Sequence, residues 1–205
     1  MPVRIVSTGG GGITLSAAST GSEFTATLPA NTGTVVTTAS SAAVTPAMLT
    51  QPLTLGTAQA STSGTFIDFT GIPSWVRRIT VMFNGVSTNG TSPILTQIGA
   101  GSVTTTGYLA GASQSNSTAT ITQVTTGFPI QLTNSAVNLT YGALTLSTLG
   151  SNVWVPSGVF WASIGVTYSS SGVLSLGGTL DRVRITTVGG TDTFDAGSIN
   201  ILYEG

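Results

Sequence analysis

The feature that most constrains the fold is a repeated pattern of short β-strand signals, with no helical periodicity of useful length. Between Val76 and Asn84 the residues alternate, so that Ile79, Val81 and Phe83 share one face of a predicted strand. Similar runs, separated by glycine, proline and asparagine turns, predict eight strands in the main part of the chain: residues 65–70, 76–84, 94–98, 119–124, 137–147, 159–168, 180–188 and 198–203.

Strands at this spacing, without helices between them, favour an all-β fold. We expect a β-sandwich of jelly-roll type, with an immunoglobulin-like sandwich as the alternative. Asn84-Gly85 and Asn89-Gly90 predict a turn region. Residues 107–118 read as a long polar loop, and residues 45–50 as a single helical turn.

The chain divides into three parts by its patterning. Residues 1–50 contain short strand-like runs, none of them long or apolar enough to build a core alone. We therefore expect this segment to be extended and intertwined with two further copies of the chain in a homotrimer. Residues 51–63 are mostly polar and predict a linker, and residues 64–205 predict the sandwich head domain.

Charge is scarce, at 5% of the residues, and none lies between Ile79 and Leu180. A net charge of −1 without a basic patch argues against nucleic-acid binding. Arg77 and Arg78 alternate in the strand pattern and read as rim charges. No segment approaches a membrane span, and no signal peptide is recognised at the start of the chain. An uncharged polar surface suits a crowded assembly or an extracellular setting.

The inventory of chemical groups is poor, because histidine and cysteine are absent and all five basic residues are arginine. This excludes a catalytic triad, a thiol nucleophile and the lysine of a phosphate-binding loop. Asp192 and Asp195 read as a solvated hairpin turn whose side chains bond local backbone. A calcium site there is a weak alternative, and so is a depolymerase with two catalytic carboxylates. We expect no enzymatic activity, no metal and no cofactor.

The aromatic residues give the candidate binding surface. Trp161 lies in the middle of a predicted strand and is expected in the core or a subunit contact. Trp154 and Tyr108 are expected to be exposed. With Gln114 and Asn116 they are the candidates for receptor binding, because sugar sites combine aromatic stacking with amide hydrogen bonds. A subunit interface uses the same residue types, and this alternative stays open.

Two stretches carry a family resemblance. Residues 63–87 and 104–108 resemble the head domain of fibre-type virion proteins of tailed bacteriophages. Residues 26–38 resemble the short repeat that precedes such domains in phage tail or head fibres. The resemblance implies a homotrimeric all-β appendage that is made in the host cytoplasm and exposed on the virion. Its N-terminus is attached to another virion protein and its C-terminal head faces outward.

These expectations define a function. The apolar residues Val3, Ile5, Ile13 and Leu15 are the candidates for virion attachment. The head is expected to bind a host-surface polysaccharide, with no nucleic acid and no membrane insertion involved. The chain is, however, much shorter than a usual tail fibre. The alternative is therefore a capsid decoration or cementing protein that is anchored by its N-terminus and has no receptor role.

Overall fold

The computed structural model describes residues 3–6, 12–15, 51–115 and 120–205. The chain forms two compact units, Met1–Ala43 and Val44–Gly205. In the first unit, β1 (Val3–Val6) and β2 (Gly12–Leu15) pair as an antiparallel two-stranded sheet. The predicted helical turn at residues 45–50 and the other predicted N-terminal strands lie outside the described residues.

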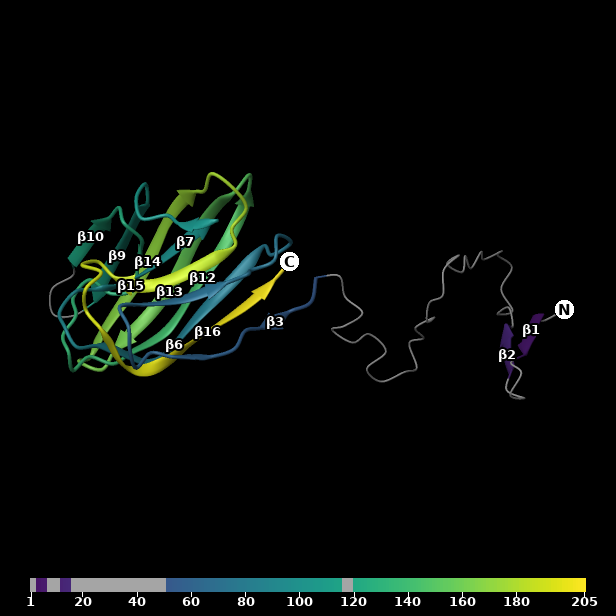
Figure 1. The fold of residues 1–205 in the computed structure, drawn as a ribbon, viewed down its shortest axis with the longest axis horizontal. Helices are drawn as coiled ribbons and strands as arrows, with labels where there is room; N and C mark the ends of the chain where they lie inside the picture. Colours follow the sequence, from purple (N-terminus) through teal and green to yellow (C-terminus); the bar gives the residue numbers. More distant parts are fainter. Residues whose placement is uncertain (1–2, 7–11, 16–50, 116–119) are drawn as a thin grey trace. The chain divides into compact units, whose positions relative to one another are not determined.

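The second unit is a β-sandwich of two antiparallel sheets, and its described residues contain no helix (Figure 1). The larger sheet has nine strands in the order β10-β9-β14-β13-β12-β6-β16-β3, with β4 also paired to β16. Its strands are β3 (Thr54–Leu55), β4 (Gln59–Ala60), β6 (Arg78–Thr88), β9 (Leu109–Ser115), β10 (Thr120–Val124), β12 (Thr140–Gly150), β13 (Val153–Ala162), β14 (Val166–Ser175) and β16 (Phe194–Glu204).

The smaller sheet has five strands in the order β11-β7-β15-β5, with β8 paired to β7. Its strands are β5 (Phe66–Thr70), β7 (Ile94–Ala100), β8 (Ser102–Val103), β11 (Phe128–Pro129) and β15 (Arg182–Thr187). The expectation of an all-β sandwich is confirmed by these two sheets.

The core lies between the sheets and follows from the alternation seen in the sequence. In β6, Ile79, Val81 and Phe83 are buried, whereas Arg78 and Asn84 are exposed. Phe83 meets Phe160 of β13 edge to face, with ring centroids 5.5 Å apart, a favourable aromatic geometry. The inward-facing apolar residues of both sheets therefore meet in one interior.

Three local predictions are wrong. Residues 107–118 contain a strand, β9, which pairs with β14 and β10. Small residues make the segment look like a loop, but Ala110 and Ala112 alternate inward with Gln114. The predicted strand 159–168 spans two strands, because the chain reverses at residues 163–165 and Gly165 has φ +82°. The predicted turn at Asn84-Gly85 is a bulge in the continuous strand β6.

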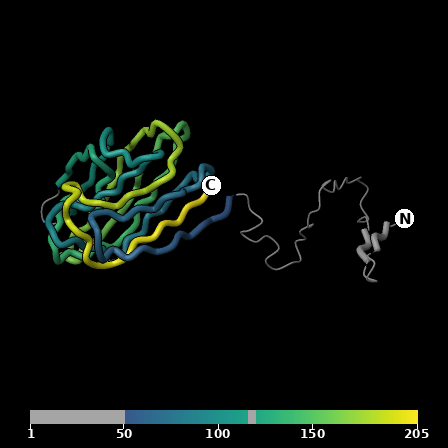
Figure 2. Tube along the Cα trace, viewed as in Figure 1, coloured from purple at the N-terminus to yellow at the C-terminus, as the bar shows by residue number. Residues whose placement is uncertain are grey.

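The predicted linker at residues 51–63 is also wrong, because this segment belongs to the sandwich. β3 and β4 pair with β16, and this part of the chain runs beside the C-terminal strand in Figure 2. Ser61 is fully buried. The Ser61 backbone N–H donates to the Gly197 carbonyl at 3.0 Å, and its hydroxyl donates to the Ala196 carbonyl at 2.7 Å. The polar residues of this segment suggested a linker. In the structure, they form the hydrogen bonds that attach an outer strand to the sheet.

Candidate functional site: an uncharged aromatic sheet face

The outer face of the nine-stranded sheet carries an exposed aromatic and apolar patch on β13. Trp161 is 47% exposed and Val159 is 60% exposed, whereas the intervening Phe160 is buried. Because neighbouring residues of a strand point to opposite faces, Trp161 and Val159 lie on the outside of the sandwich. Trp161 is therefore not a core residue, so the expectation of a core position is wrong, and the alternative of a subunit contact stays a prediction.

Trp161 forms a pair with Tyr141 on the neighbouring strand. The two residues are directly opposite in the register of β12 and β13. Their ring centroids lie 5.7 Å apart, with the ring planes inclined by 37°. Two adjacent rings on an open sheet make an apolar platform on which the apolar face of a sugar ring or another flat group can stack.

The platform is surrounded by small hydroxyl side chains. Thr167 of β14 is opposite Trp161, and Ser115 of β9 is opposite Thr167. Further hydroxyl residues on the outer face of these strands are Ser113, Ser157, Ser169 and Ser171, all of them exposed. A hydroxyl group both donates and accepts hydrogen bonds. The face can therefore bind a neutral polar ligand, and no charged residue occurs on β9, β10, β12, β13 or β14.

Most of the predicted receptor residues lie elsewhere. Tyr108 is fully buried, and Trp154 is 4% exposed. Gln114 is also buried, and its Oε1 accepts a hydrogen bond from the Thr133 hydroxyl at 3.4 Å. Asn116 lies outside the described residues. The expected exposed cluster of these four residues is therefore wrong for Tyr108, Trp154 and Gln114.

Tyr108 has a structural role instead. Its hydroxyl accepts a hydrogen bond from the Ile98 backbone N–H at 2.8 Å and donates to the Thr104 carbonyl at 2.9 Å. Its ring packs edge to face on Phe128, with centroids 4.9 Å apart. Burial raises the pKa of Tyr108, because the ionised phenolate would lose its hydration. The polar neighbours of Tyr108 in the sequence gave no sign of this burial.

Trp161 and Tyr141 were the residues that sequence reasoning missed. Phe160 and Trp161 are adjacent aromatics in one strand, and alternation alone cannot decide which of them faces the core. One available signal was Tyr141, whose strand shows the same alternation with Leu144 and Leu146 on the inner face. Pairing these two strands in antiparallel register would have placed Tyr141 and Trp161 together.

The four predicted attachment residues lie within the β1–β2 sheet and are paired across its two strands. Val3 is opposite Leu15, and Ile5 is opposite Ile13 in the backbone register. The four positions therefore form two cross-strand pairs of one small sheet.

Four of the nine charged residues of the sandwich lie on or next to β5 and β15 of the five-stranded sheet, where they form two ion pairs, and a third ion pair joins Arg78 and Glu204 of the larger sheet. Arg184 of β15 makes two hydrogen bonds to the Asp68 carboxylate, at 2.7 and 2.6 Å, and its guanidinium lies 4.0 Å from the Phe66 ring centroid. The hydrogen bonds to Asp68 raise the pKa of Arg184. Asp181 accepts from Arg182, and this contact lowers the pKa of Asp181. In each of these two ion pairs the arginine and the aspartate neutralise each other. Little net charge is therefore left to bind a ligand.

Asp192 and Asp195 connect two loops of the sandwich. Asp192 Oδ2 accepts a hydrogen bond from the Ser92 backbone N–H at 2.8 Å, and Asp195 contacts the Ser87 hydroxyl. Their partners lie about a hundred residues away in the sequence, so the predicted local turn bonding is replaced by contacts between segments. Within the described ranges, no three acidic, histidine or cysteine residues gather in a way that would hold a metal ion.

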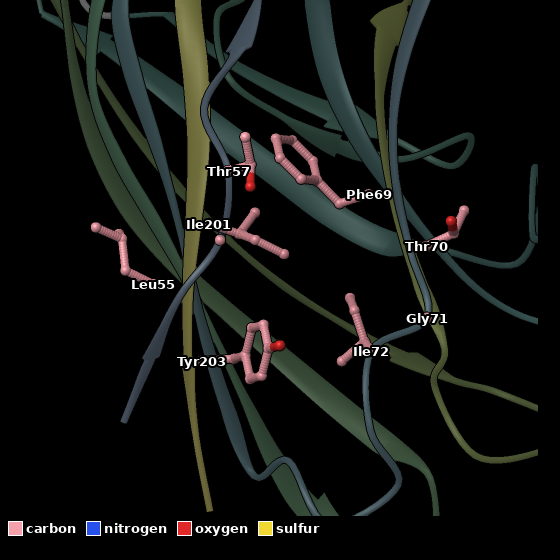
Figure 3. A pocket seen from close by; sticks show the side chains of 9 residues that line it. Leu55, Thr57, Phe69, Thr70, Gly71, Ile72, Ile201 and Tyr203 are labelled. Atoms are coloured by element: carbon pink, nitrogen blue, oxygen red, sulfur yellow. The ribbon is translucent and has the colours of Figure 1, made fainter. Parts of the chain in front are cut away.

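A cavity of about 340 Å³ opens at the side of the sandwich where β16 and β5 face each other. Its lining includes Phe69, Ile72, Ile201 and Tyr203, which surround the space in Figure 3. Tyr203 also contacts Trp75, with ring centroids 5.9 Å apart. The lining has no acid, base or nucleophile beyond hydroxyl groups, so the cavity provides no catalytic constellation.

Comparison with protein-family models, curated proteins and solved structures found no match to this chain. In the part of the chain that the structure describes, there is no helix with the length and apolar character to cross a membrane.

Proposed function

We propose that this chain is a structural bacteriophage protein, a homotrimeric tail or head fibre whose sandwich head binds neutral carbohydrate on the host surface. The observation that carries the proposal is the pair of the exposed Trp161 and the half-buried Tyr141, on a part of the sheet, β9, β10 and β12–β14, that has no charged residue and is rich in hydroxyl groups. The resemblance of residues 63–87 and 26–38 to phage fibre proteins supports the same function. We propose no enzymatic role.

The chemistry of the face supports a neutral sugar ligand. The rings of Tyr141 and Trp161 offer apolar surface for the C–H face of a pyranose. Serine and threonine hydroxyls around them offer hydrogen bonds to sugar hydroxyls. An acidic polysaccharide would need basic side chains for charge pairing, and the strands of this face carry none.

The division of the chain supports attachment through the N-terminus. The first unit, Met1–Ala43, contains the β1–β2 sheet, whose two strands pair with each other. We propose that the β1–β2 sheet, with Val3, Ile5, Ile13 and Leu15, docks on another virion protein, so that the chain is displayed on the particle surface. A capsid decoration protein would use the same attachment, and the two functions differ in the role of the sandwich face.

We also propose that the sandwich is a modified jelly roll. If β12, β13 and β14 are counted as one position, the larger sheet reads β3-β16-β6-(β12–β14)-β9-β10, with β4 also on β16, and the smaller reads β5-β15-β7-β11. In both sheets, strands distant in the sequence lie side by side, as in the Greek-key connections of a jelly roll. The β12–β14 meander and β16 then enlarge one sheet, which widens the face that carries Trp161.

The test is binding of neutral oligosaccharides by the full chain, using an array of hexose and N-acetylhexosamine oligomers, followed by calorimetry with the best binder. We expect Trp161→Ala to weaken that binding by about tenfold, which is about 1.4 kcal/mol. Val188→Ala is the matched control, because Val188 has a similar exposure, 49%, and follows β15. Equal binding by Trp161→Ala and the unmodified chain would contradict the assignment of this face.

Three further measurements separate the alternatives. Light scattering at two concentrations should give three times the 20.5 kDa chain mass, and a single-chain mass would contradict the homotrimer. A lower mass for Trp161→Ala would assign the aromatic face to subunit contact.

Particles without the protein that adsorb normally but lose physical stability would indicate a decoration protein. Release of reducing sugar from a bound polysaccharide would contradict the non-enzymatic role.

A further inference from the structure

The outermost strand at one end of the nine-stranded sheet, β10, has an unprotected edge. Among the described residues, β10 pairs only with β9, in continuous register from Thr120 to Val124. Four of its five residues are exposed, and Ile121 is 82% exposed. Proteins usually protect such an edge with a charge, a proline or a bulge, because its free backbone groups can pair with another strand. β10 contains none of these features.

The opposite end of the same sheet is also exposed and apolar. It is formed by β3 and β4, where Leu53 is 58% exposed and Leu55 is 63% exposed. Isolated exposed leucines are common on protein surfaces. Here, however, large apolar side chains stand at both ends of one sheet in a chain of very low charge.

The two edges of the five-stranded sheet are closed in contrast. The free side of β7 is covered by two-residue strands, β8 and β11, and β11 ends in Pro129. At the other edge, the Asp68 carbonyl of β5 accepts a hydrogen bond from the Gln59 side-chain amide at 2.7 Å. The Asp68–Arg184 ion pair also places charge beside this edge. Edge protection is therefore present in one sheet and missing in the other.

We propose that β10 of one copy lies against the β3–β4 edge of a second copy. In the homotrimer of the proposed function, on which this inference rests, the three large sheets then join edge to edge around the threefold axis. A ring of three requires two different surfaces that fit each other on every copy. The two ends of the nine-stranded sheet supply such a pair, and Ile121 of one copy would be covered by Leu53 and Leu55 of the next.

The charge distribution favours a second copy over a charged partner. Residues 79–180 contain no charge, and residues 51–63 contain none either. Two identical chains can therefore approach by these edges without like-charge repulsion, and a charged partner would find no complementary group there. Backbone hydrogen bonds and burial of the exposed isoleucine and leucines would stabilise the contact, as in other strand-addition complexes.

Cysteine cross-linking tests the contact directly, because the chain contains no cysteine. We expect the double variant Ile121→Cys with Leu55→Cys, or with Leu53→Cys, to form covalent dimers and trimers under mild oxidation. Each single variant should stay uncross-linked. Cross-linking of Ile121→Cys alone would mean that two β10 strands meet, and would overturn the proposal. No cross-linking in either double variant of a chain that is trimeric by light scattering would also overturn it.

A second measurement places a charge on the edge. We expect Thr122→Lys, in the middle of β10, to lower the light-scattering mass from three chains toward one at micromolar concentration. Thr191→Lys, in an exposed turn, is the control and should stay trimeric. A trimeric Thr122→Lys variant would overturn the edge contact while leaving the proposed function intact. A single-chain mass for the unmodified protein would overturn the trimer, and this inference with it.

Discussion

Gln59 and Asp68 connect the two sheets of the sandwich at its open side. The Gln59 side-chain amide, on a strand of the larger sheet, donates to the Asp68 backbone carbonyl on the edge of the smaller sheet, over 2.7 Å. The same Asp68 binds Arg184 through its carboxylate. Gln59, which the sequence pattern assigns to a linker, thus binds the edge strand β5 of the smaller sheet.

Replacing Gln59 with alanine should destabilise the sandwich. The change removes one side-chain hydrogen bond to backbone, so we expect a loss of about 0.5–1.5 kcal/mol in the free energy of unfolding. Chemical denaturation followed by tryptophan fluorescence measures this loss. Gln51→Ala, at an exposed position for which no side-chain hydrogen bond to another described residue is found, is the control and should change stability little. Equal stability of the two variants would show that the hydrogen bond from Gln59 to the Asp68 carbonyl does not contribute to stability.

Replacing Tyr108 with phenylalanine should cost more than its small change in size suggests. The ring contact with Phe128 is kept, but the buried Ile98 N–H loses its acceptor. An unsatisfied buried donor costs about 1–3 kcal/mol. Tyr141→Phe, on the outer face, is the matched control. A loss below a few tenths of a kcal/mol at position 108 would mean that another acceptor replaces the hydroxyl.

The stability of the protein should fall at alkaline pH. Burial raises the pKa of Tyr108 above its ordinary value, so the folded state holds a proton that the unfolded state releases. This contribution is fully present below the unfolded tyrosine pKa of about 10 and is lost as the pH rises further. Unfolding midpoints from pH 7 to pH 11 should show the loss, and Tyr108→Phe should flatten it. An identical slope in that variant would contradict the assignment to Tyr108.

Two glycine substitutions should differ strongly in cost. Gly197 has φ +91°, and a Cβ there would lie 2.3 Å from the Gly85 carbonyl oxygen. Gly101 has φ +73° with open space around it. We expect Gly101→Ala to lose about 1–2 kcal/mol from the left-handed backbone alone. Gly197→Ala should lose more, because two strands must move apart. Thermal unfolding compares them, and a smaller loss at Gly197 would contradict the close backbone approach.

Sequence reasoning predicted the fold class better than it predicted the site. Alternation was strong enough to define strands in β6, where Ile79, Val81 and Phe83 recur at every second position, and in residues 180–188, where Val183 and Ile185 alternate with two arginines. β9 was missed because two alanines and a glutamine line its inner face, and small or polar residues give little hydrophobic contrast.

The site predictions failed for a different reason. Tyr108, Trp154 and Trp161 are large amphipathic residues, and their burial depends on strand register and on which sheet covers them. A shift of one residue in register moves a side chain from the core to the surface. Polar neighbours in the sequence therefore suggested exposure for Tyr108, while Ile98 and Thr104, brought close by the fold, surround its hydroxyl.

The pairing of β3 with β16 brings the start and the end of the sandwich together. Thr54 is opposite Tyr203 in the register, and the chain leaves the domain where it entered. Such a domain behaves as an insertable module, since closely spaced ends allow it to be joined to a loop or rearranged in chain order. A circular permutant that links Gly205 to Gln51 and opens at the Ser151–Asn152 turn should keep both sheets. A peptide fused to Gly205 would emerge beside Gln51, at the β3 end of the nine-stranded sheet. The strand β10 lies at the other end of that sheet.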